Sequence, residues 1–273
     1  AGFVVTAPAR RDLDVTDREA VWRAVEAARP RLVINAAAFT AVDAAESRPD
    51  EAFAINRDGV AWLAAACAGA DIPLVHVSTD YVFDGAKGQP YVETDPVAPQ
   101  GVYGASKEAG ERALRALLEP HLIVRTSWVY DAQGRNFVRT MLRLGAERDR
   151  LDVVDDQWGA PTFADDLAGT LLAAGRRLIE APEPALFGTF HHGGGGATTW
   201  YRFARAIFAL AQAAGRKVPA EIVPIPTSAY PTPARRPADG RLDCGKFQRV
   251  HGIAPPPWED ALARAMPEIL ARS

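Results

Sequence analysis

The sequence predicts an α/β protein built on a doubly wound, mostly parallel β-sheet, with a smaller lobe in the C-terminal half. Residues 32–35, 74–78 and 122–126 are short apolar runs of the kind that parallel sheets bury on both faces. Stretches with helical periodicity separate these runs, and this alternation is typical of a right-handed parallel sheet. The chain has 273 residues, 48% of them hydrophobic, which suffices for one large domain or a domain with a small lobe.

The first half of the chain alternates strands and helices. Residues 2–6 are expected to form a strand. Thr16 with Glu19 three residues later has the form of a capping box, which predicts a helix from Asp17 to about Ala28. After these elements we expect a strand at 32–35, a helix at about 49–68, a strand at 74–78, a Gly/Pro-rich loop, a helix at about 103–118 and a strand at 122–126.

Proline and glycine interrupt the second half more often. Helical periodicity recurs at 137–148, 162–179, 200–214 and 258–271, and short strands are expected at 151–154, 188–191 and 221–224. We therefore expect a main domain at residues 1–150, and at 151–273 mainly a small lobe whose chain returns to the main domain.

Composition and charge argue against several classes of protein. A net charge of -3 and a pI near 6.0 give no broad basic field, so we expect no nucleic-acid partner. No run reaches the ~18 apolar residues of a membrane span and no signal peptide is visible, so we expect no membrane association. Cys67 and Cys244 form no disulfide framework, which fits a reducing cytoplasm. His191 and His192 should face opposite sides of a strand, so we expect no metal site.

The sequence YGASK at 103–107 carries the clearest chemical signal. Positions i and i+4 of a helix share one face, so the Tyr103 hydroxyl and the Lys107 ammonium should point into the same space. A neighbouring ammonium lowers the pKa of a phenol and makes tyrosine a usable general acid or base. Ser78 or Thr79, at the end of the preceding strand, would supply a second hydrogen bond to the same substrate oxygen. Although Tyr-x-x-x-Lys also occurs by chance, this context suits the reduction of a carbonyl or its reverse.

Small and cationic side chains indicate two further contacts. Ala36, Ala37 and Ala38 follow a predicted strand, and their small side chains would let a cofactor approach the backbone, so we place this turn against a cofactor. Arg236, next to Arg235, ends a Pro-rich extended segment and is a candidate clamp for a diphosphate, because guanidinium binds phosphate through two hydrogen bonds. The alternative is a rigid surface strap with solvated arginines.

Six motifs, at 35–43, 78–85, 103–107, 125–130, 156–162 and 228–237, resemble those of extended short-chain dehydrogenase/reductases that act on nucleotide sugars. More narrowly, they resemble the dTDP-4-dehydrorhamnose reductases, and the resemblance covers nearly the whole chain. It implies a Rossmann-like fold in which residues 1–150 bind NADPH or NADH and most of 151–273 bind a nucleotide sugar. It also implies reduction of the C4 keto group of dTDP-4-dehydro-L-rhamnose to dTDP-L-rhamnose, for cell-surface polysaccharide synthesis.

The resemblance implies roles for individual residues. Tyr103 would donate the proton to the carbonyl oxygen, Lys107 would lower the Tyr103 pKa and bind the cofactor ribose, and Thr79, with Ser78 as its competitor, would polarise the carbonyl. The expected cofactor contacts are Asp14, Val15, Ala36, Ala37, Ala38, Tyr103 and Lys107, and the expected substrate contacts are Thr79, Asp80, Trp128 and Arg236. Asp14 has the alternative of being only a turn residue.

The start of the sequence departs from the family pattern. A dinucleotide-binding fold should open with a strand and a Gly-rich turn that meets the pyrophosphate, and nothing of that kind precedes Gly2. We therefore expect the first βα unit to be missing, either from the protein or only from this chain. Arg10 and Arg11 would suit the 2′-phosphate of NADPH, but paired arginines on a loop are commonly just solvated, so NADPH and NADH both stay open.

Two other functions stay open as alternatives. One is a nucleotide-sugar dehydratase or epimerase, although Tyr81 stands after Asp80 where a dehydratase typically has glutamate. The other is a non-catalytic nicotinamide-binding regulatory subunit, against which the set of Thr79, Tyr103 and Lys107 argues. No heptad or repeat marks an interface, so a homodimer, and Mg²⁺ at its subunit contact, stay open as well.

Overall fold

The computed structural model describes residues 3–272, and its centre is a four-stranded parallel sheet. The strands are β1 (Val33–Asn35), β2 (Leu74–Thr79), β3 (His121–Thr126) and β8 (Gly188–His191), in the order β1-β2-β3-β8. Parallel pairing places their carboxyl ends at one edge of the sheet. The expected α/β fold with a parallel sheet is confirmed, and polar residues that follow β1 and β2 are brought to the same edge.

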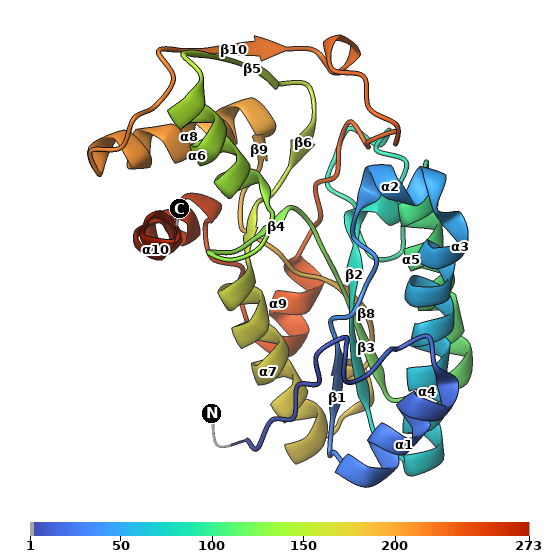
Figure 1. Cartoon of the computed structure of the whole chain (residues 1–273). Helices are drawn as coiled ribbons and strands as arrows, with labels where there is room; N and C mark the ends of the chain where they lie inside the picture. Colours follow the sequence, from blue (N-terminus) through green and yellow to red (C-terminus); the bar gives the residue numbers. More distant parts are fainter. Residues whose placement is uncertain (1–2, 273) are drawn as a thin grey trace.

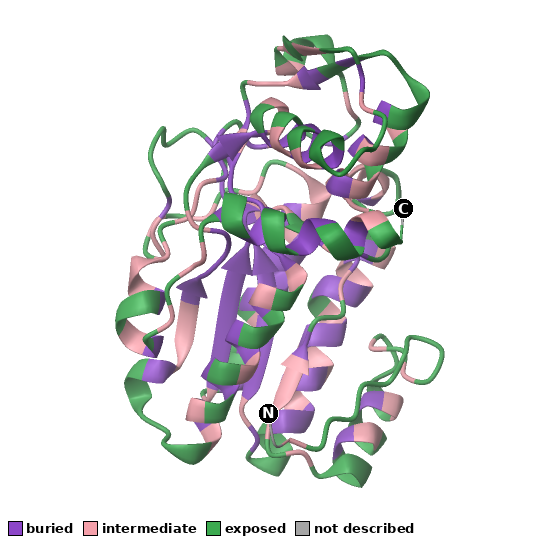
Figure 2. Cartoon of the chain, turned by 90° about the vertical axis from the view of Figure 1, so that its left-hand side faces the viewer, coloured by how far each residue is buried: buried purple, intermediate pink, exposed green. Residues whose placement is uncertain are grey.

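Helices cover both faces of this sheet (Figure 1). On one face lie α1 (Arg18–Ala28), α4 (Gly59–Ala70) and α5 (Val102–Leu117); on the other lie α7 (Ala164–Glu180) and α9 (Gly245–His251). Alternation along β2 explains the two cores, because Leu74 packs with the first set of helices and Val75 with the second. Figure 2 shows the strands largely buried and the covering helices with buried inner and exposed outer faces.

Two expectations near the start of the chain are wrong. Residues 3–6 form no strand: Val4 is 101% and Val5 70% exposed, because no neighbouring strand pairs with them in the described part of the chain; Gly2 lies outside that part. The helix at 18–28 is present, but its N-cap is Asp17, whose Oδ1 accepts from the Ala20 N–H at 3.0 Å. Thr16 bonds Asp14 instead, and because the third helical residue after Asp17 is Ala20, the expected capping box does not form.

The helix expected at 49–68 is interrupted. It consists of α3 (Pro49–Phe53), a π-helical turn η1 (Ala54–Asp58) and α4, and α2 (Val42–Ser47) precedes it. The wider turn of a π-helix often marks a functional site. Here it carries Asn56, which is fully buried and bonds both backbone groups of Phe39 and the Ser106 hydroxyl of α5. Asn56 therefore bridges the β1 loop and α5.

The second half forms a lobe with its own apolar cluster. Tyr130, Phe203 and Trp258 belong to this cluster. Figure 1 shows the ribbon of this lobe above the main sheet. The chain returns to the main sheet through α7, β8 and α9. The remaining elements are η2 (Asp80–Val82), β4 (Val129–Tyr130), α6 (Phe137–Glu147), β5 (Arg150–Val154), β6 (Trp158–Gly159), β7 (Thr162–Phe163), η3 (Pro184–Leu186), β9 (Thr198–Thr199), α8 (Trp200–Ala213), β10 (Glu221–Ile225), η4 (Thr227–Ala229) and α10 (Trp258–Ala271).

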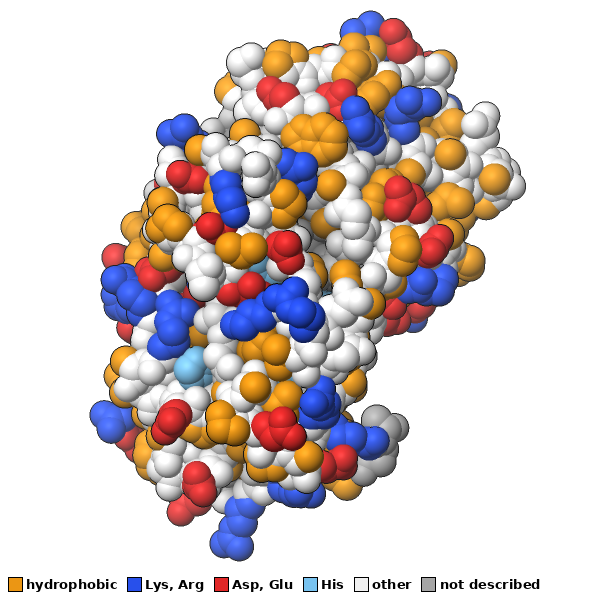
Figure 3. All heavy atoms as spheres, turned by 180° about the vertical axis from the view of Figure 1, so that it is seen from behind, with side chains coloured by type: hydrophobic (Ala, Val, Ile, Leu, Met, Phe, Trp, Pro, Cys, Tyr) orange, Lys and Arg blue, Asp and Glu red, His pale blue; other side chains and the backbone are white. Residues whose placement is uncertain are grey.

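The surface carries charges of both signs. Acidic and basic side chains are interspersed on the face that Figure 3 displays, in keeping with the net charge of -3. None of the helices described in residues 3–272 is long and apolar enough to cross a membrane.

Candidate active site

The C-terminal end of β2 and the first turn of α5 meet at the carboxyl edge of the sheet. Gly104 makes this approach close: a Cβ atom there would stand 2.1 Å from the Tyr81 carbonyl oxygen. The rings of Tyr81 and Tyr103 pack edge to face with centroids 5.4 Å apart. The small second residue of the YGASK motif thus brings the Tyr103 side chain to the end of β2.

Thr79 and Tyr103, the two expected catalytic hydroxyls, lie together at this edge. The Thr79 hydroxyl donates to Asp80 Oδ1 at 3.0 Å and accepts from the Tyr81 N–H at 3.2 Å, and it lies near enough to the Tyr103 phenol to lower the pKa of that group. Burial, together with the Asp80 charge, raises the pKa of Tyr103 to about 12 despite this effect of Thr79. The expected lowering of this pKa is therefore wrong. A phenol with a raised pKa holds its proton at neutral pH, which is the form needed to donate it.

Lys107 is buried and bonded to β2. Its Nζ donates to the Val77 carbonyl at 2.7 Å and lies 3.3 Å from Nε2 of His76. Burial lowers the pKa of Lys107 to about 8, and Glu111 opposes this shift. The ammonium is thus an easily titrated group inside the site rather than a solvated cation.

The Ser78 hydroxyl forms its hydrogen bond with Glu111 rather than with the Tyr103 region. Its side chain lies on the same face of β2 as that of His76, and its hydroxyl donates to Glu111 Oε1 at 2.6 Å. Glu111 is fully buried and also binds Arg125 and Arg115. Between the two hydroxyl candidates, Thr79 is therefore the one that adjoins Tyr103.

Asp80 adds a second titratable group. Its carboxyl is buried, and desolvation raises its pKa to about 7, against the lowering effect of the Thr79 hydrogen bond. Gly240 leaves it room, because a Cβ atom there would stand 2.4 Å from Asp80 Oδ2. Asp80 is thus held against Thr79 by packing as well as by hydrogen bonding.

The turn after β1 has the form expected of a cofactor contact. Ala36 and Ala37 are exposed, Ala38 is partly buried, and the Ala37 N–H donates to Asn35 Oδ1 at 3.0 Å. Because β1 pairs with β2, this turn lies beside the strand that carries Lys107's partners. The backbone of residues 36–38 is exposed between methyl side chains, near the strand that holds the buried Lys107 amine. Such a surface can accept a dinucleotide.

Asp14 and Val15, two of the expected cofactor contacts, lie in the loop that precedes α1. Asp14 Oδ1 accepts from the N–H and the hydroxyl of Thr16, at 2.9 and 2.8 Å, so the structure shows it as a turn residue at an exposed position. Val15 packs against Gly59 of α4, where a Cβ atom would meet Val15 Cγ2 at 3.0 Å. Their contact with the adenine stays a prediction.

Two further substrate candidates, Trp128 and Arg236, have different surroundings. Trp128 has a φ of 46° and stacks on Trp200 with centroids 3.5 Å apart, over Gly159. Arg236 is held by Asp43 through two hydrogen bonds of 3.1 and 2.8 Å, so it is not the solvated residue of the alternative interpretation. Any phosphate at Arg236 must compete with the Asp43 carboxylate.

Sequence reasoning missed several residues of this region. His76 and Glu111 are buried polar groups on β2 and α5, and Asp43 precedes the site by a long stretch of chain. The signal for Glu111 was available in principle, since it follows Lys107 by one turn of the same helix. The partners of Asp43 and His76 are set by tertiary contacts that no local pattern contains.

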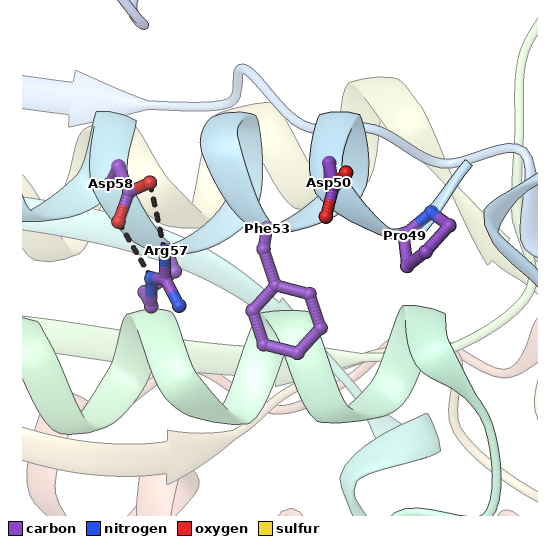
Figure 4. Close-up of a pocket in the computed structure, with 5 residues that line it drawn as sticks. All are labelled: Pro49, Asp50, Phe53, Arg57 and Asp58. Carbon is purple, nitrogen blue, oxygen red and sulfur yellow. Dashed lines mark hydrogen bonds and ion pairs between the residues drawn. The ribbon is translucent and has the colours of Figure 1, made fainter.

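Within residues 3–272, no group of three or more His, Cys, Asp or Glu side chains comes together that would hold a metal ion. A surface hollow along α3 and η1 contains none of the expected site residues, and in it Arg57 bonds Asp58 (Figure 4). The residues that line it are Pro49, Asp50, Phe53, Arg57 and Asp58.

Known proteins resemble this chain over almost its full length. The family model described as "RmlD substrate binding domain" matches residues 1–271. The dTDP-4-dehydrorhamnose reductase of Sinorhizobium fredii is 46% identical over 93% of this chain and 86% of its own, and that of Escherichia coli K12 is 44% identical over 94% and 85%. A crystal structure of dTDP-4-dehydrorhamnose reductase from Bacillus anthracis in complex with NADP superposes with a TM-score of 0.88 at 37% identity, covering 97% of this chain and 90% of its own. The chain therefore belongs to the dTDP-4-dehydrorhamnose reductase family.

Proposed function

We propose that this protein uses NADPH or NADH to reduce the C4 keto group of dTDP-4-dehydro-L-rhamnose, giving dTDP-L-rhamnose for cell-surface polysaccharide synthesis. The observation that carries the proposal is that the Thr79 and Tyr103 hydroxyls meet at the carboxyl edge of the sheet, with the buried amine of Lys107 one helical turn after Tyr103. Family membership supplies the substrate, since the relatives bear that reaction in their names.

The chain's own residues supply orientation and the proton. The nicotinamide, when bound, supplies the hydride. Tyr103, which holds its proton at neutral pH, donates it to the carbonyl oxygen, and the Thr79 hydroxyl hydrogen-bonds to the same oxygen and polarises the bond. Lys107 binds the ribose and stabilises the phenolate that remains. The raised Tyr103 pKa makes this stabilisation necessary, because an unaided buried phenolate is a costly product.

The two parts of the chain divide the ligands between them in this proposal. Residues 1–150 hold the cofactor through Asp14, Val15 and the turn at 36–38, and most of 151–273 holds the sugar nucleotide. Trp128 and Asp80 lie where the lobe meets the edge of the sheet and would contact the sugar, while Arg236 would take the diphosphate once Asp43 releases it.

The relative from Bacillus anthracis was crystallised with NADP, which favours NADPH for this chain without excluding NADH. A cytoplasmic location is supported by the free thiols of Cys67 and Cys244. Homodimer formation and Mg²⁺ at a subunit contact stay predictions.

Nicotinamide absorbance tests the proposal, with dTDP-4-dehydro-L-rhamnose and each coenzyme offered in turn. We expect oxidation that needs the sugar and falls by at least ~100-fold in Tyr103→Phe, while cofactor binding persists. Tyr130→Phe is the matched control, because the buried Tyr130 hydroxyl has no hydrogen-bond partner among residues 3–272 and far less is lost with it. Cofactor binding without turnover on the keto sugar would favour the regulatory subunit, and water elimination from dTDP-glucose would favour a dehydratase.

A further inference from the structure

A buried histidine lies against Lys107. His76 Nε2 is 3.3 Å from Lys107 Nζ, and the same Nζ donates to the Val77 carbonyl at 2.7 Å. His76 is wholly buried, and strand alternation turns its ring, like Leu74, toward the α5 side of β2. The ring therefore belongs to the surroundings of the amine rather than to the surface of the site.

The tautomer of His76 follows from its other neighbour. The Ala37 N–H donates to Asn35 Oδ1 at 3.0 Å, and this orients the amide so that its NH₂ group lies 3.1 Å from His76 Nδ1. Because an amide NH₂ group only donates, Nδ1 must accept, and the proton of the neutral ring is on Nε2. Burial and the nearby Lys107 hold the pKa of His76 well below its usual value, so the neutral ring is the relevant form.

The Nε2–H bond then points at the amine of Lys107. An ammonium carries three donors and no acceptor, so it would face another donor, whereas a neutral amine accepts through its lone pair. For the ring to accept from a protonated Lys107, its proton must move to Nδ1 and the Asn35 amide must turn. The Ala37 N–H would then lose its acceptor.

We propose that Asn35 and His76 are positioning residues that keep Lys107 readily deprotonated and couple its protonation to the turn at residues 36–38. The proposal deepens the proposed function, on which it rests, because that turn is where we expect the cofactor and Lys107 serves the reaction. Two hydrogen bonds and one close contact connect them, in the order Ala37, Asn35, His76 and Lys107.

Other charged groups around Lys107 also affect its pKa. On its own helix, Tyr103 lies one turn before it and Glu111 one turn after. The Glu111 charge raises the Lys107 pKa, but Arg125 from β3 and Arg115 already pair with that carboxylate. From β2 the amine faces His76 and a carbonyl, and β1 contributes the neutral Asn35 through His76. The lowered pKa of Lys107, about 8, agrees in direction with a donor facing the amine.

Nitrogen NMR of the free protein with labelled histidine rings tests the tautomer directly. The chain has five histidines, and the His76 signals are assigned from their loss in His76→Gln. We expect a proton on Nε2 and a bare Nδ1 at about pH 9, where Lys107 is largely neutral. A ring protonated on Nδ1, or one that is charged, at this pH would overturn the proposal.

Titration of the Lys107 side chain by carbon NMR, assigned with Lys107→Met, tests the coupling. Asn35→Leu removes the donor to Nδ1 without adding charge, so the ring becomes free to accept from the ammonium, and the Lys107 pKa should rise by ~1 unit or more. Asn35→Asp, which accepts both from Ala37 and from a protonated Nδ1, should raise it as well, and serves if the first variant does not fold.

The matched control is His121→Gln, a buried histidine of β3 that bonds the Leu118 carbonyl, and it should leave the titration of Lys107 in place. A Lys107 pKa that is the same in both Asn35 variants as in the unaltered protein would make Asn35 and His76 mere packing residues. These measurements use the ligand-free protein, so their outcome does not depend on whether the protein reduces the keto sugar.

Discussion

The backbone of Gly104 lies against the carbonyl of Tyr81, with a Cβ atom at Gly104 placed only 2.1 Å from that oxygen. Helix α5 can approach the end of β2 this closely only with glycine at that position. Since Tyr103 is the preceding residue, the contact sets the position of its phenol relative to Thr79. A second such approach occurs at Gly110, where a Cβ atom would stand 2.0 Å from the Asn56 carbonyl.

Gly104→Ala should therefore displace α5. We expect turnover to fall at least ~10-fold and the free energy of unfolding to fall by ~1–3 kcal/mol, the usual cost of overpacking. Gly169→Ala on α7 is the control, because no atom lies within 4 Å of its added Cβ and alanine favours helix. Urea denaturation and steady-state kinetics measure both, and equal stability of the two variants would refute the close approach.

Substitutions at Ser78 and Thr79 should affect different properties, stability in the first case and turnover in the second. Ser78→Ala leaves the buried Glu111 carboxylate short of one donor, so it should cost ~1–3 kcal/mol of stability with turnover largely retained. Thr79→Val keeps the shape but loses the hydroxyl beside Tyr103, and turnover should fall ~10–1000-fold. A larger loss of turnover in Ser78→Ala than in Thr79→Val would reverse the assignment.

The ion pair of Arg236 and Asp43 should hold the guanidinium away from the substrate. Asp43→Asn weakens that pair, so the KM for the sugar nucleotide should fall by a few fold, whereas Arg236→Met should raise KM ~10-fold or more. Arg235→Met, at the exposed neighbouring position, is the control and should change KM little. The comparison is made at low ionic strength, where a charge contact is largest. If the Arg235 and Arg236 variants raise KM equally, neither arginine is a specific clamp.

The buried carboxyl of Asp80 should make stability depend on pH. Its pKa is about 7 in the folded protein but ordinary, near 4, in the unfolded chain, so between these values the folded state binds the additional proton. Its contribution to stability is full below pH ~4 and is lost as the pH rises through 7. Asp80→Asn should therefore be more stable than the unaltered protein by roughly 2–4 kcal/mol at pH 8, and little different near pH 4. Unfolding free energies measured across this range would contradict us if the two curves ran parallel.

The sheet and its helices were predictable because their signals are local. The apolar runs that became β2 and β3, and the periodic stretch that became α5, each contain their own pattern. The wrong predictions concern residues whose local structure depends on a neighbouring segment of the chain. Residues 3–6 have the composition of a strand, but the described residues 3–272 offer no strand that pairs with them. Asp17 rather than Thr16 caps α1 because Asp14 accepts from the Thr16 hydroxyl.

Within the site, the sequence determined which groups are present and their order along the chain. The spacing of Tyr103 and Lys107 on one helix, the hydroxyls at the end of β2, and the small residues at 36–38 all follow from periodicity and strand ends, which are properties of consecutive residues. These suffice for the fold class and, with the family resemblance, for the reaction.

Only the tertiary structure decided the protonation states and the partners. Burial raised the pKa of Tyr103 and lowered that of Lys107, Glu111 took the Ser78 hydroxyl, and Asp43 took Arg236. Desolvation and hydrogen bonding depend on which side chains meet across the fold, often a hundred or more residues apart in the chain. A local pattern therefore names the reactive groups, and the packing around them sets their charge.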